Sequence, residues 1–377
     1  MSNYSTNGFL VALLEAANAD TKHPDHGEAS IYLSKFRALE TKFFQDVHPF
    51  VDFGLAISES KKSGCGRTNI FTVHGCQHVY DLIRSLDKFA KSVSQQASQG
   101  ITVLEAYILL CAAHVHDSAN VSKREDHPER CREVLAEHKD LFVSSVSQQI
   151  YDVASVHGGH HPEYGKDTFR TIDVDAHTPP RLLLIASILR LADELSENED
   201  RVPESVVEHH EPSAMSKLAH AYARSFKNFE LRNESLSITY GVYPEDHNLT
   251  VEREGKRQSF YDFLEEKIDV IEKEARYCSQ YGRPSLHISE INIVVRQYDG
   301  MKPSKALKTE KFSLYLNHGY PKCECSLCER ADGLANRGVM KLSGFFVESK
   351  LEGVSRTLNV PPICAAFERF KQRFFSK

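Results

Sequence analysis

Residues 103–117 read VLEAYILLCAAHVHD, and this stretch decides the fold. Its apolar residues are almost continuous up to His114, which is typical of a helix buried on all sides. The stretch ends in the doublet His116-Asp117, and the polar sequence SANVSK follows at once. Adjacent residues of a regular helix point about 100° apart, so these two side chains can share one ion only near a helix end. The sequence therefore predicts a buried central helix that presents two polar side chains at its end.

A second strongly apolar stretch, RLLLIASILRLADEL, covers residues 181–195 and carries Asp193. A carboxylate that emerges from such a stretch is costly to bury unless it is paired or binds a metal. Asp193 is therefore a candidate ligand on a second buried helix.

Apolar residues at helical spacing predict further helices on both sides of the central one. These helices are expected at residues 30–44, 74–89, 130–137 and 146–157. After residue 200 the pattern changes to a strand-like pair, 236–240 and 249–252, around a turn at 244–246, then a charged amphipathic helix, 258–277, and a strand, 288–295. We expect a mainly α fold, a helical bundle with a smaller α+β C-terminal part.

The change of pattern places a soft domain boundary near residue 285. We expect residues 1–284 to form the helical domain, with its core at 65–205 and a helical and hairpin extension. Residues 285–377 would form a small α+β region. No internal repeat is visible in the chain.

The composition limits the class of protein. The chain has 377 residues, a formal net charge of -6, 41% hydrophobic residues and 26% charged residues. This balance is ordinary for a globular protein and argues against a general nucleic-acid binder. No apolar run is long enough for a transmembrane helix, and no signal peptide is visible. Nine cysteines without a secretory signal indicate reduced thiols, so we expect a cytoplasmic protein, with a homo-oligomer left open.

Histidines and carboxylates fall in a fixed order along the predicted helices. They are His78 in VHGCQHVYDL, the doublet His116-Asp117, the histidines of ASVHGGHHPEYG, and Asp193. Facing helices of a bundle can each donate one ligand to a central ion. Imidazole nitrogens and carboxylate oxygens together suit divalent metal ions such as Zn, Mn, Fe, Co or Ni. The sequence therefore predicts a metal site inside the bundle.

This ordered pattern resembles the HD superfamily of metal-dependent phosphohydrolases, over roughly residues 65–205. LRLADELSENEDRVPE is similar to the HD domains found beside nucleotide cyclases and other effectors in bacteria. HPERCREVL resembles the HP motif of HD-GYP phosphodiesterases, and GRTNIFTVHGCQHVYDL resembles the start of dGTPase-type HD domains. The resemblance implies an HD-type helical bundle.

The resemblance also implies a ligand set. His78, His116, Asp117 and Asp193 would hold a first ion. His127, together with His157 or His161, would match the positions at which two-metal members add ligands. The cofactor would be one or two divalent ions, Mn, Mg, Fe, Co, Ni or Zn.

Cations for phosphate oxygens cluster around His127. Four basic residues surround it: Lys123, Arg124, Arg130 and Arg132. Arg190 lies one turn before Asp193 and can pair with a carboxylate or a phosphate. We expect substrate phosphate to contact Lys123, Arg124, Arg130 and Arg190, and the catalytic groups to be His116, Asp117, His127 and Lys123. Asp200 and Arg201 are expected to form an ion pair at a helix end.

These residues predict metal-assisted hydrolysis of a small nucleotide, above all (deoxy)nucleoside phosphates and triphosphates. Three alternatives stay open. One is a phosphodiesterase for cyclic nucleotides or cyclic oligonucleotides. The others are a nucleotide-sensing regulatory module and a nuclease, which the acidic balance disfavours.

Cys323, Cys325 and Cys328 lie within six positions near the C-terminus. Three thiolates at this spacing suit a structural zinc, with His318 or Cys364 as the fourth ligand. The alternative is a set of reduced surface thiols.

Overall fold

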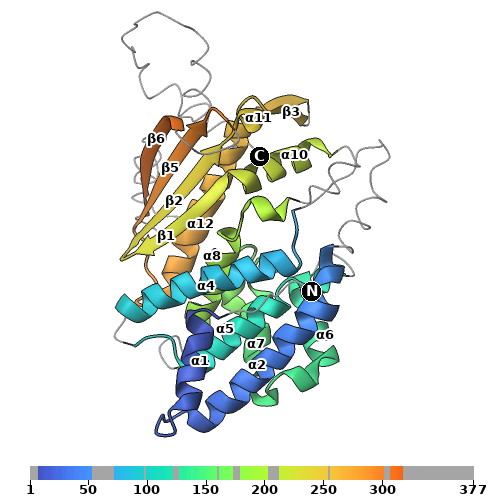
Figure 1. Cartoon of the computed structure of the whole chain (residues 1–377), viewed down its shortest axis with the longest axis vertical. Helices are drawn as coiled ribbons and strands as arrows, with labels where there is room; N and C mark the ends of the chain where they lie inside the picture. Colours follow the sequence, from blue (N-terminus) through green and yellow to red (C-terminus); the bar gives the residue numbers. More distant parts are fainter. Residues whose placement is uncertain are drawn as a thin grey trace, which may run out of the picture.

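A computed structural model describes residues 7–52, 72–96, 99–121, 127–158, 161–172, 179–202, 212–253, 255–300 and 306–316. The fold is mainly α, with a helical bundle on one side and a mixed sheet on the other (Figure 1). The predicted fold class is confirmed. None of the described helices is both long and apolar enough to cross a membrane.

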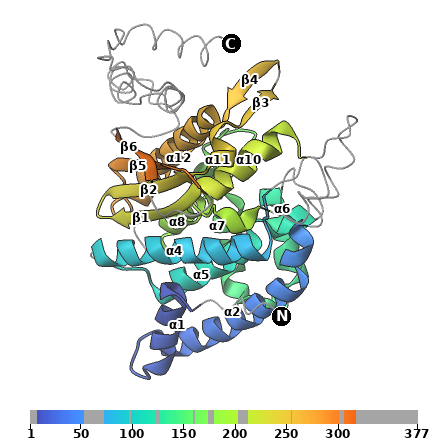
Figure 2. The same ribbon diagram turned by 45° about the horizontal axis from the view of Figure 1, so that its top comes forward.

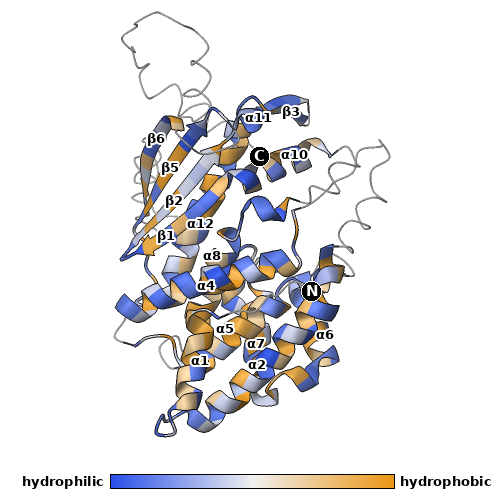
Figure 3. Cartoon of the chain, viewed as in Figure 1, coloured by the Kyte–Doolittle hydropathy of each residue, from blue (hydrophilic) through white to orange (hydrophobic). Residues whose placement is uncertain are grey.

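The bundle is formed by helices from the first half of the chain. They are α1 (Phe9–Ala19), α2 (His26–Asp46), α4 (Cys76–Gln96), α5 (Val103–Val115), α6 (His127–Glu137), α7 (Ser147–Ser155) and α8 (Leu182–Glu194). Every residue of α5 except Leu104 is buried, as its sequence predicts. Apolar residues gather where α1, α2 and α5 meet, whereas the outer face of α4 is hydrophilic (Figure 3). The predicted buried central helix is therefore α5.

One buried ion pair aligns the starts of α5 and α8. Glu105 closes a capping box with Thr102 at the first turn of α5. The same carboxylate accepts hydrogen bonds from the backbone N–H, Nε and Nη2 of Arg181, at 2.8, 2.8 and 2.7 Å. Burial raises the pKa of Glu105, but the bonds from Arg181 outweigh it and hold the pKa below its usual value. The helices α5 and α8 are thus set side by side, and each ends at a candidate ligand.

The second half of the chain adds a four-stranded sheet and its covering helices. The strands are β1 (Phe226–Arg232), β2 (Ser235–Val242), β5 (Glu290–Tyr298) and β6 (Ala306–Tyr315), in the order β1-β2-β5-β6. β2 and β5 are parallel, and the other two neighbouring pairs are antiparallel. The helices are α10 (Ala214–Ser225), the short α11 (Pro244–His247) and α12 (Phe260–Gly282), which lies along one face of the sheet (Figure 2). β3 (Thr250–Arg253) and β4 (Lys256–Ser259) form a separate hairpin.

The predicted hairpin between residues 236–240 and 249–252 is wrong. β2 pairs with β1 and β5, whereas β3 pairs with β4. The segment expected to be a turn is α11, because Pro244 occupies its first position, where the fixed φ of proline suits a helix start. The sheet also joins strands from both sides of the boundary expected near residue 285, since β2 lies beside β5.

Candidate metal centre

Five helix ends converge at one place in the bundle. His78 lies in the first turn of α4, and His116 caps the C-terminus of α5, directly before Asp117. His127 begins α6, His157 follows α7, and Asp193 lies in the last turn of α8. Residues far apart in the sequence therefore meet because each helix begins or ends at the same point.

The first group consists of His78, His116 and Asp193, whose ligand atoms all lie within 4.8 Å of one another. His78 Nε2 lies 3.2 Å from His116 Nε2 and 3.1 Å from Asp193 Oδ1. His116 Nε2 lies 3.7 Å from Asp193 Oδ1. These residues can offer one carboxylate oxygen and two imidazole nitrogens to one ion.

The second group consists of Asp117, His127 and His157, and it meets the same distance limit. His127 Nε2 lies 3.2 Å from His157 Nε2 and 3.1 Å from Asp117 Oδ1. His157 Nε2 lies 3.7 Å from Asp117 Oδ1. Of the two alternatives, His157 and His161, it is His157 that joins this group.

The two oxygens of Asp117 face different groups. Oδ1 faces His127 and His157, at the distances just given. Oδ2 lies 3.4 Å from His116 Nε2 and 3.7 Å from His78 Nε2. The carboxylate therefore stands between the two groups and can offer one oxygen to each.

The donor set fits divalent metal ions. Metal bonds of about 2.0–2.2 Å place neighbouring ligand atoms about 2.8–3.6 Å apart in octahedral or tetrahedral geometry. The separations within each group, 3.1–3.7 Å, are close to this range. The residues present therefore fit an ion in each group.

Backbone contacts direct two imidazoles toward the centre. His116 Nδ1 donates to the carbonyl oxygen of Ala113 at 2.9 Å, and His157 Nδ1 donates to that of Ala154 at 2.6 Å. A proton on Nδ1 leaves the lone pair on Nε2, the atom that faces the other candidate ligands. Both rings are thus held in the tautomer that binds a metal.

The electrostatics of the centre favour bound positive charge. Burial works to raise the pKa of Asp117 and Asp193, but the neighbouring imidazoles, chiefly His116 and His78, hold both well below the usual range. Burial opposes a charged His116, yet Asp117 and Asp193 raise its pKa to about 9. Two ionised carboxylates therefore attract a proton onto His116 in the absence of a stronger cation, and a divalent ion can replace that proton.

The pKa of His157 is lowered, unlike that of His116, because desolvation by burial is the largest influence on this ring. Desolvation and the charge of His116 lower the pKa of His157 to about 4. The ring is therefore neutral at physiological pH, as a metal ligand must be.

Two of the six side chains reach solvent more than the others. Asp193 is 23% exposed and His127 is 19% exposed, whereas the remaining four are at most 9% exposed. Among the six candidate ligands, the edge formed by Asp193 and His127 is therefore the most accessible to solvent.

His161 lies outside both groups. Its Nδ1 accepts hydrogen bonds from the backbone N–H groups of Glu163 and Tyr164, at 3.2 and 3.4 Å. These bonds use the lone pair on Nδ1 and leave the proton on Nε2, and the ring stacks on Tyr164. Neither nitrogen is presented to an ion, so the environment of His161 disfavours the ligand role expected for it.

Arg190 has a structural setting. It is 2% exposed and forms a two-point ion pair with Glu274, while Nη1 donates to Thr168 Oγ1 at 2.9 Å. Of the two partners left open, a carboxylate and a phosphate, the structure places a carboxylate beside Arg190. The ring of Tyr277 lies 4.6 Å from the guanidinium carbon.

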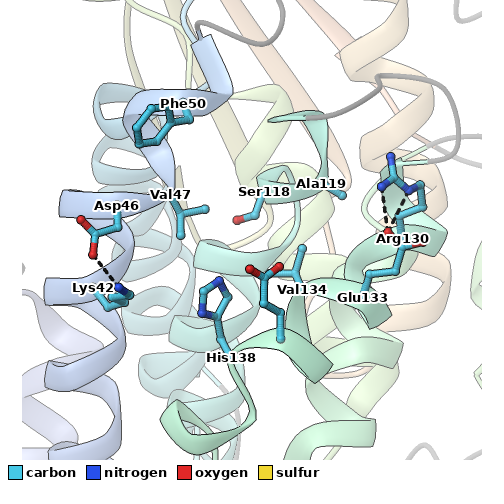
Figure 4. A pocket seen from close by; sticks show the side chains of 11 residues that line it. Lys42, Asp46, Val47, Phe50, Ser118, Ala119, Arg130, Glu133, Val134 and His138 are labelled. Atoms are coloured by element: carbon cyan, nitrogen blue, oxygen red, sulfur yellow. Dashed lines mark hydrogen bonds and ion pairs between the residues drawn. The ribbon is translucent and has the colours of Figure 1, made fainter.

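Arg130 lines a separate cavity of about 510 Å³ between α2 and α6 (Figure 4). Its guanidinium pairs with Glu133 at 2.7 Å, and Lys42 pairs with Asp46 at 2.6 Å on the α2 side of the same cavity. None of the six candidate ligands lines this cavity. Lys123, Arg124 and the cluster Cys323, Cys325 and Cys328 lie outside the described residues.

Sequence reasoning missed the residues that support the segment before His78. Asp52 Oδ1 accepts the backbone N–H groups of His74 and Gly75, at 2.7 and 2.9 Å. A side chain at Gly75 would lie 2.3 Å from Asp52 Oδ2 and 2.4 Å from the carbonyl oxygen of His48, so the close approach needs glycine. Of these supporting residues, only Gly75 gives a signal in the sequence, because a glycine can mark a close approach of the backbone.

Arg201 supports the same segment from the other side. The ion pair expected between Asp200 and Arg201 is replaced by one between Glu197 and Arg201, at 2.7 Å. Arg201 Nε also donates to the carbonyl oxygen of Val73 at 2.9 Å. The segment that follows α8 is thus bonded to the segment that precedes α4. This contact brings Asp193, at the end of α8, close to His78, at the start of α4.

Comparison with known proteins adds one match. The HD-CE family model matches residues 69–277, which is more than half of the chain. No curated protein and no solved structure matches. The matched range contains all six residues of the two groups, and its HD-type domain indicates a metal-dependent hydrolase. The protein therefore belongs to the HD-CE family, within the HD superfamily whose His, His-Asp, Asp pattern its candidate metal centre carries.

Proposed function

We propose that the protein is a two-ion phosphohydrolase of small nucleotides, with (deoxy)nucleoside phosphates and triphosphates as substrates. The observation that carries this proposal is that the two carboxylate oxygens of Asp117 face different ligand groups. Oδ1 lies 3.1 Å from His127 Nε2, and Oδ2 lies 3.4 Å from His116 Nε2. A carboxylate shared between two ligand groups is suited to a pair of neighbouring ions, the arrangement used in many phosphoryl-transfer sites.

The residues of the centre have distinct tasks in this proposal. The two ligand groups would hold divalent ions, which would supply an activated water and polarise the phosphoryl oxygen. Asp117 holds the two halves of the site together, and the neutral His157 keeps a lone pair directed inward. The partly exposed edge at Asp193 and His127 admits the phosphate. Lys123 and Arg124 follow the doublet in the sequence and would neutralise the remaining phosphate charge.

The available cations favour a small substrate over a strand. Arg190 is engaged by Glu274, and Arg130 lines a separate cavity. The phosphate-binding charge expected near the centre is then reduced to Lys123 and Arg124, which suffices for a few phosphates. A groove for a polymer would need cations along many phosphates, and the net charge of -6 disfavours such a groove.

One observation favours a second candidate, a cyclic nucleotide or cyclic oligonucleotide phosphodiesterase. His127 belongs to HPERCREVL, the segment that resembles the HP motif of HD-GYP phosphodiesterases. Its Nε2 lies 3.1 Å from Asp117 Oδ1, where a ligand of a second ion would stand.

A metal-by-substrate screen tests both candidates. Purified protein is incubated with Mg, Mn, Co or Ni and with dNTPs, NTPs, nucleoside monophosphates or cyclic mono- and dinucleotides, and the released products are identified. Turnover of nucleoside phosphates supports the first candidate, and turnover of cyclic substrates alone supports the second. Strand cleavage is assayed in parallel on single-stranded DNA and RNA. Efficient cleavage of strands without turnover of any small nucleotide would overturn both candidates.

A further inference from the structure

We propose that Asn120 is a positioning residue that keeps the carboxylate of Asp117 divided between the two ligand groups. The proposal deepens the two-ion function and rests on it. It concerns the attachment of the second ion, which Asp117 Oδ1, His127 and His157 would hold.

The backbone after the doublet brings Asn120 back over Asp117. Ser118–Val121 form a 3-10 helix, in which side chains three residues apart lie over one another. The backbone N–H of Asn120 donates to the carbonyl oxygen of Asp117 at 3.0 Å. Its side-chain Nδ2 donates to Asp117 Oδ1 at 2.9 Å, and Asn120 is only 4% exposed.

The side chain of Asn120 donates to Oδ1 of Asp117, and the position of this oxygen determines how the carboxylate is shared between the two ligand groups. Rotation of a carboxylate about its last bond is a soft motion, so the position of the two oxygens depends on what they contact. Asn120 holds Oδ1 on the side of His127, and Oδ2 then has to face His116. Without this bond, both oxygens can turn toward the first group.

The histidines cannot replace Asn120 in this task. An imidazole that binds an ion through Nε2 presents a lone pair there, so it no longer donates to the carboxylate. The amide of Asn120, among the side chains that the structure describes, donates to Oδ1 and carries its hydrogen in every state of the site. A carboxylate oxygen has two lone pairs, so it can accept this bond and bind an ion at once.

The side-chain oxygen of Asn120 supports the same role. Oδ1 of Asn120 is buried and has no hydrogen-bond partner among the residues that the structure describes. An unpaired buried polar atom costs about 1–3 kcal/mol, so Asn120 is a poor choice for stability alone. Its contact with Asp117 explains an asparagine at this position.

The test compares Asn120→Ala and Asn120→Leu with the wild-type protein. Leucine fills the space of asparagine without a donor, so it separates the hydrogen bond from packing. Ser118→Ala is the matched control, because Ser118 Oγ bonds the carbonyl oxygen of His114 in the same turn without contacting Asp117. Mn²⁺ binding is measured by titration, bound metal is counted, and the electron paramagnetic resonance spectrum reports whether two Mn²⁺ ions are coupled.

We expect the wild-type protein and Ser118→Ala to bind two coupled Mn²⁺ ions. Both Asn120 variants should keep the first ion, bind the second about 10–100-fold more weakly and lose the coupled spectrum. Circular dichroism and melting identify any variant that fails to fold, and the other variant then carries the test. If the wild-type protein binds two ions and a folded Asn120 variant binds both as tightly, the role of Asn120 is overturned. If the wild-type protein itself binds only one ion, the two-ion function fails first.

Discussion

The guanidinium of Arg190 is held by the carboxylate of Glu274 through two hydrogen bonds, of 2.6 and 3.0 Å. The pair joins α8, which carries Asp193 three residues further on, to α12, which covers the sheet. Burial works to lower the pKa of Arg190, but the charge and hydrogen bonds of Glu274 raise it, so the arginine is charged at every accessible pH. The rings of Phe169 and Tyr277 lie beside its guanidinium. The pair therefore anchors a ligand-bearing helix to the second half of the fold.

We expect Arg190→Ala to lower the free energy of unfolding by about 3–5 kcal/mol, because it leaves the Glu274 carboxylate buried without its partner. The double variant Arg190→Met, Glu274→Leu should recover most of this loss. Urea unfolding of both proteins measures the difference. Turnover by the double variant distinguishes the two roles of Arg190: a KM close to the wild-type value agrees with a structural pair, and a large rise in KM at normal stability would restore the phosphate contact.

Asp117 and Asp193 should differ in how many ions they control. Asp117→Ala removes an oxygen from each group, so both ions and at least 100-fold of the turnover should be lost while the helical content stays. Asp193→Ala removes an oxygen from the first group only, so about one ion should remain. Bound metal and circular dichroism are measured on the same samples. Full metal content and near-normal activity in Asp117→Ala would contradict the site assignment.

His157 and His161 offer a matched comparison within one loop. His157→Ala should weaken binding of the second ion and reduce turnover, because Nε2 of His157 belongs to the second group. His161→Ala should leave metal content unchanged, since the Nδ1 lone pair of His161 is occupied by backbone N–H groups. Metal analysis after dialysis decides between them, and equal losses in the two variants would show that both histidines bind metal.

Asp87 should make the stability of the protein depend on pH. Burial raises the pKa of Asp87 to about 6, although the backbone N–H of Leu10 donates to Oδ1 at 2.8 Å. The folded state then binds more protons than the unfolded state between about pH 4 and pH 6, so stability falls as the pH rises through this window. Asp87→Asn keeps an oxygen that can accept the hydrogen bond and cannot ionise.

The stability of Asp87→Asn relative to the wild-type protein should therefore increase by about 1–2 kcal/mol between pH 4.5 and pH 7.5. Urea midpoints at the two values measure this change. A constant difference between the two proteins at both pH values would show that Asp87 is ionised in the folded state throughout.

The sequence predicts most of the helices because the bundle follows from apolar spacing alone. The predictions for α5 and α8 are accurate since both helices are apolar almost all round and end at polar residues. β1 and β6 were not predicted, because FKNFELR and ALKTEKFSLY mix charged residues into edge strands. The separate pairing of β3 with β4 depends on distant strands that occupy the sides of β2, which no local pattern shows.

The site could be predicted as far as local patterns and family resemblance reach. The ordered histidines and aspartates identify the region, and the helix end at His116 explains how adjacent side chains serve one centre. The partner of Arg190 could not be predicted, because Glu274 lies 84 residues further along the chain. The difference between His157 and His161 depends on a turn whose N–H groups bond the second ring, and the spacing of the two residues does not reveal it.

Because β5 lies between β2 and β6, the strands Glu290–Tyr298 and Ala306–Tyr315 are built into the sheet rather than appended to it. The family match ends at residue 277, within α12 and before either of these strands. A fragment cut at that point would end inside the helix that holds Arg190 and would leave one edge of β2 without its neighbour. Recombinant fragments intended for crystallisation or metal analysis should therefore extend past Leu316, or they will aggregate through the exposed strand.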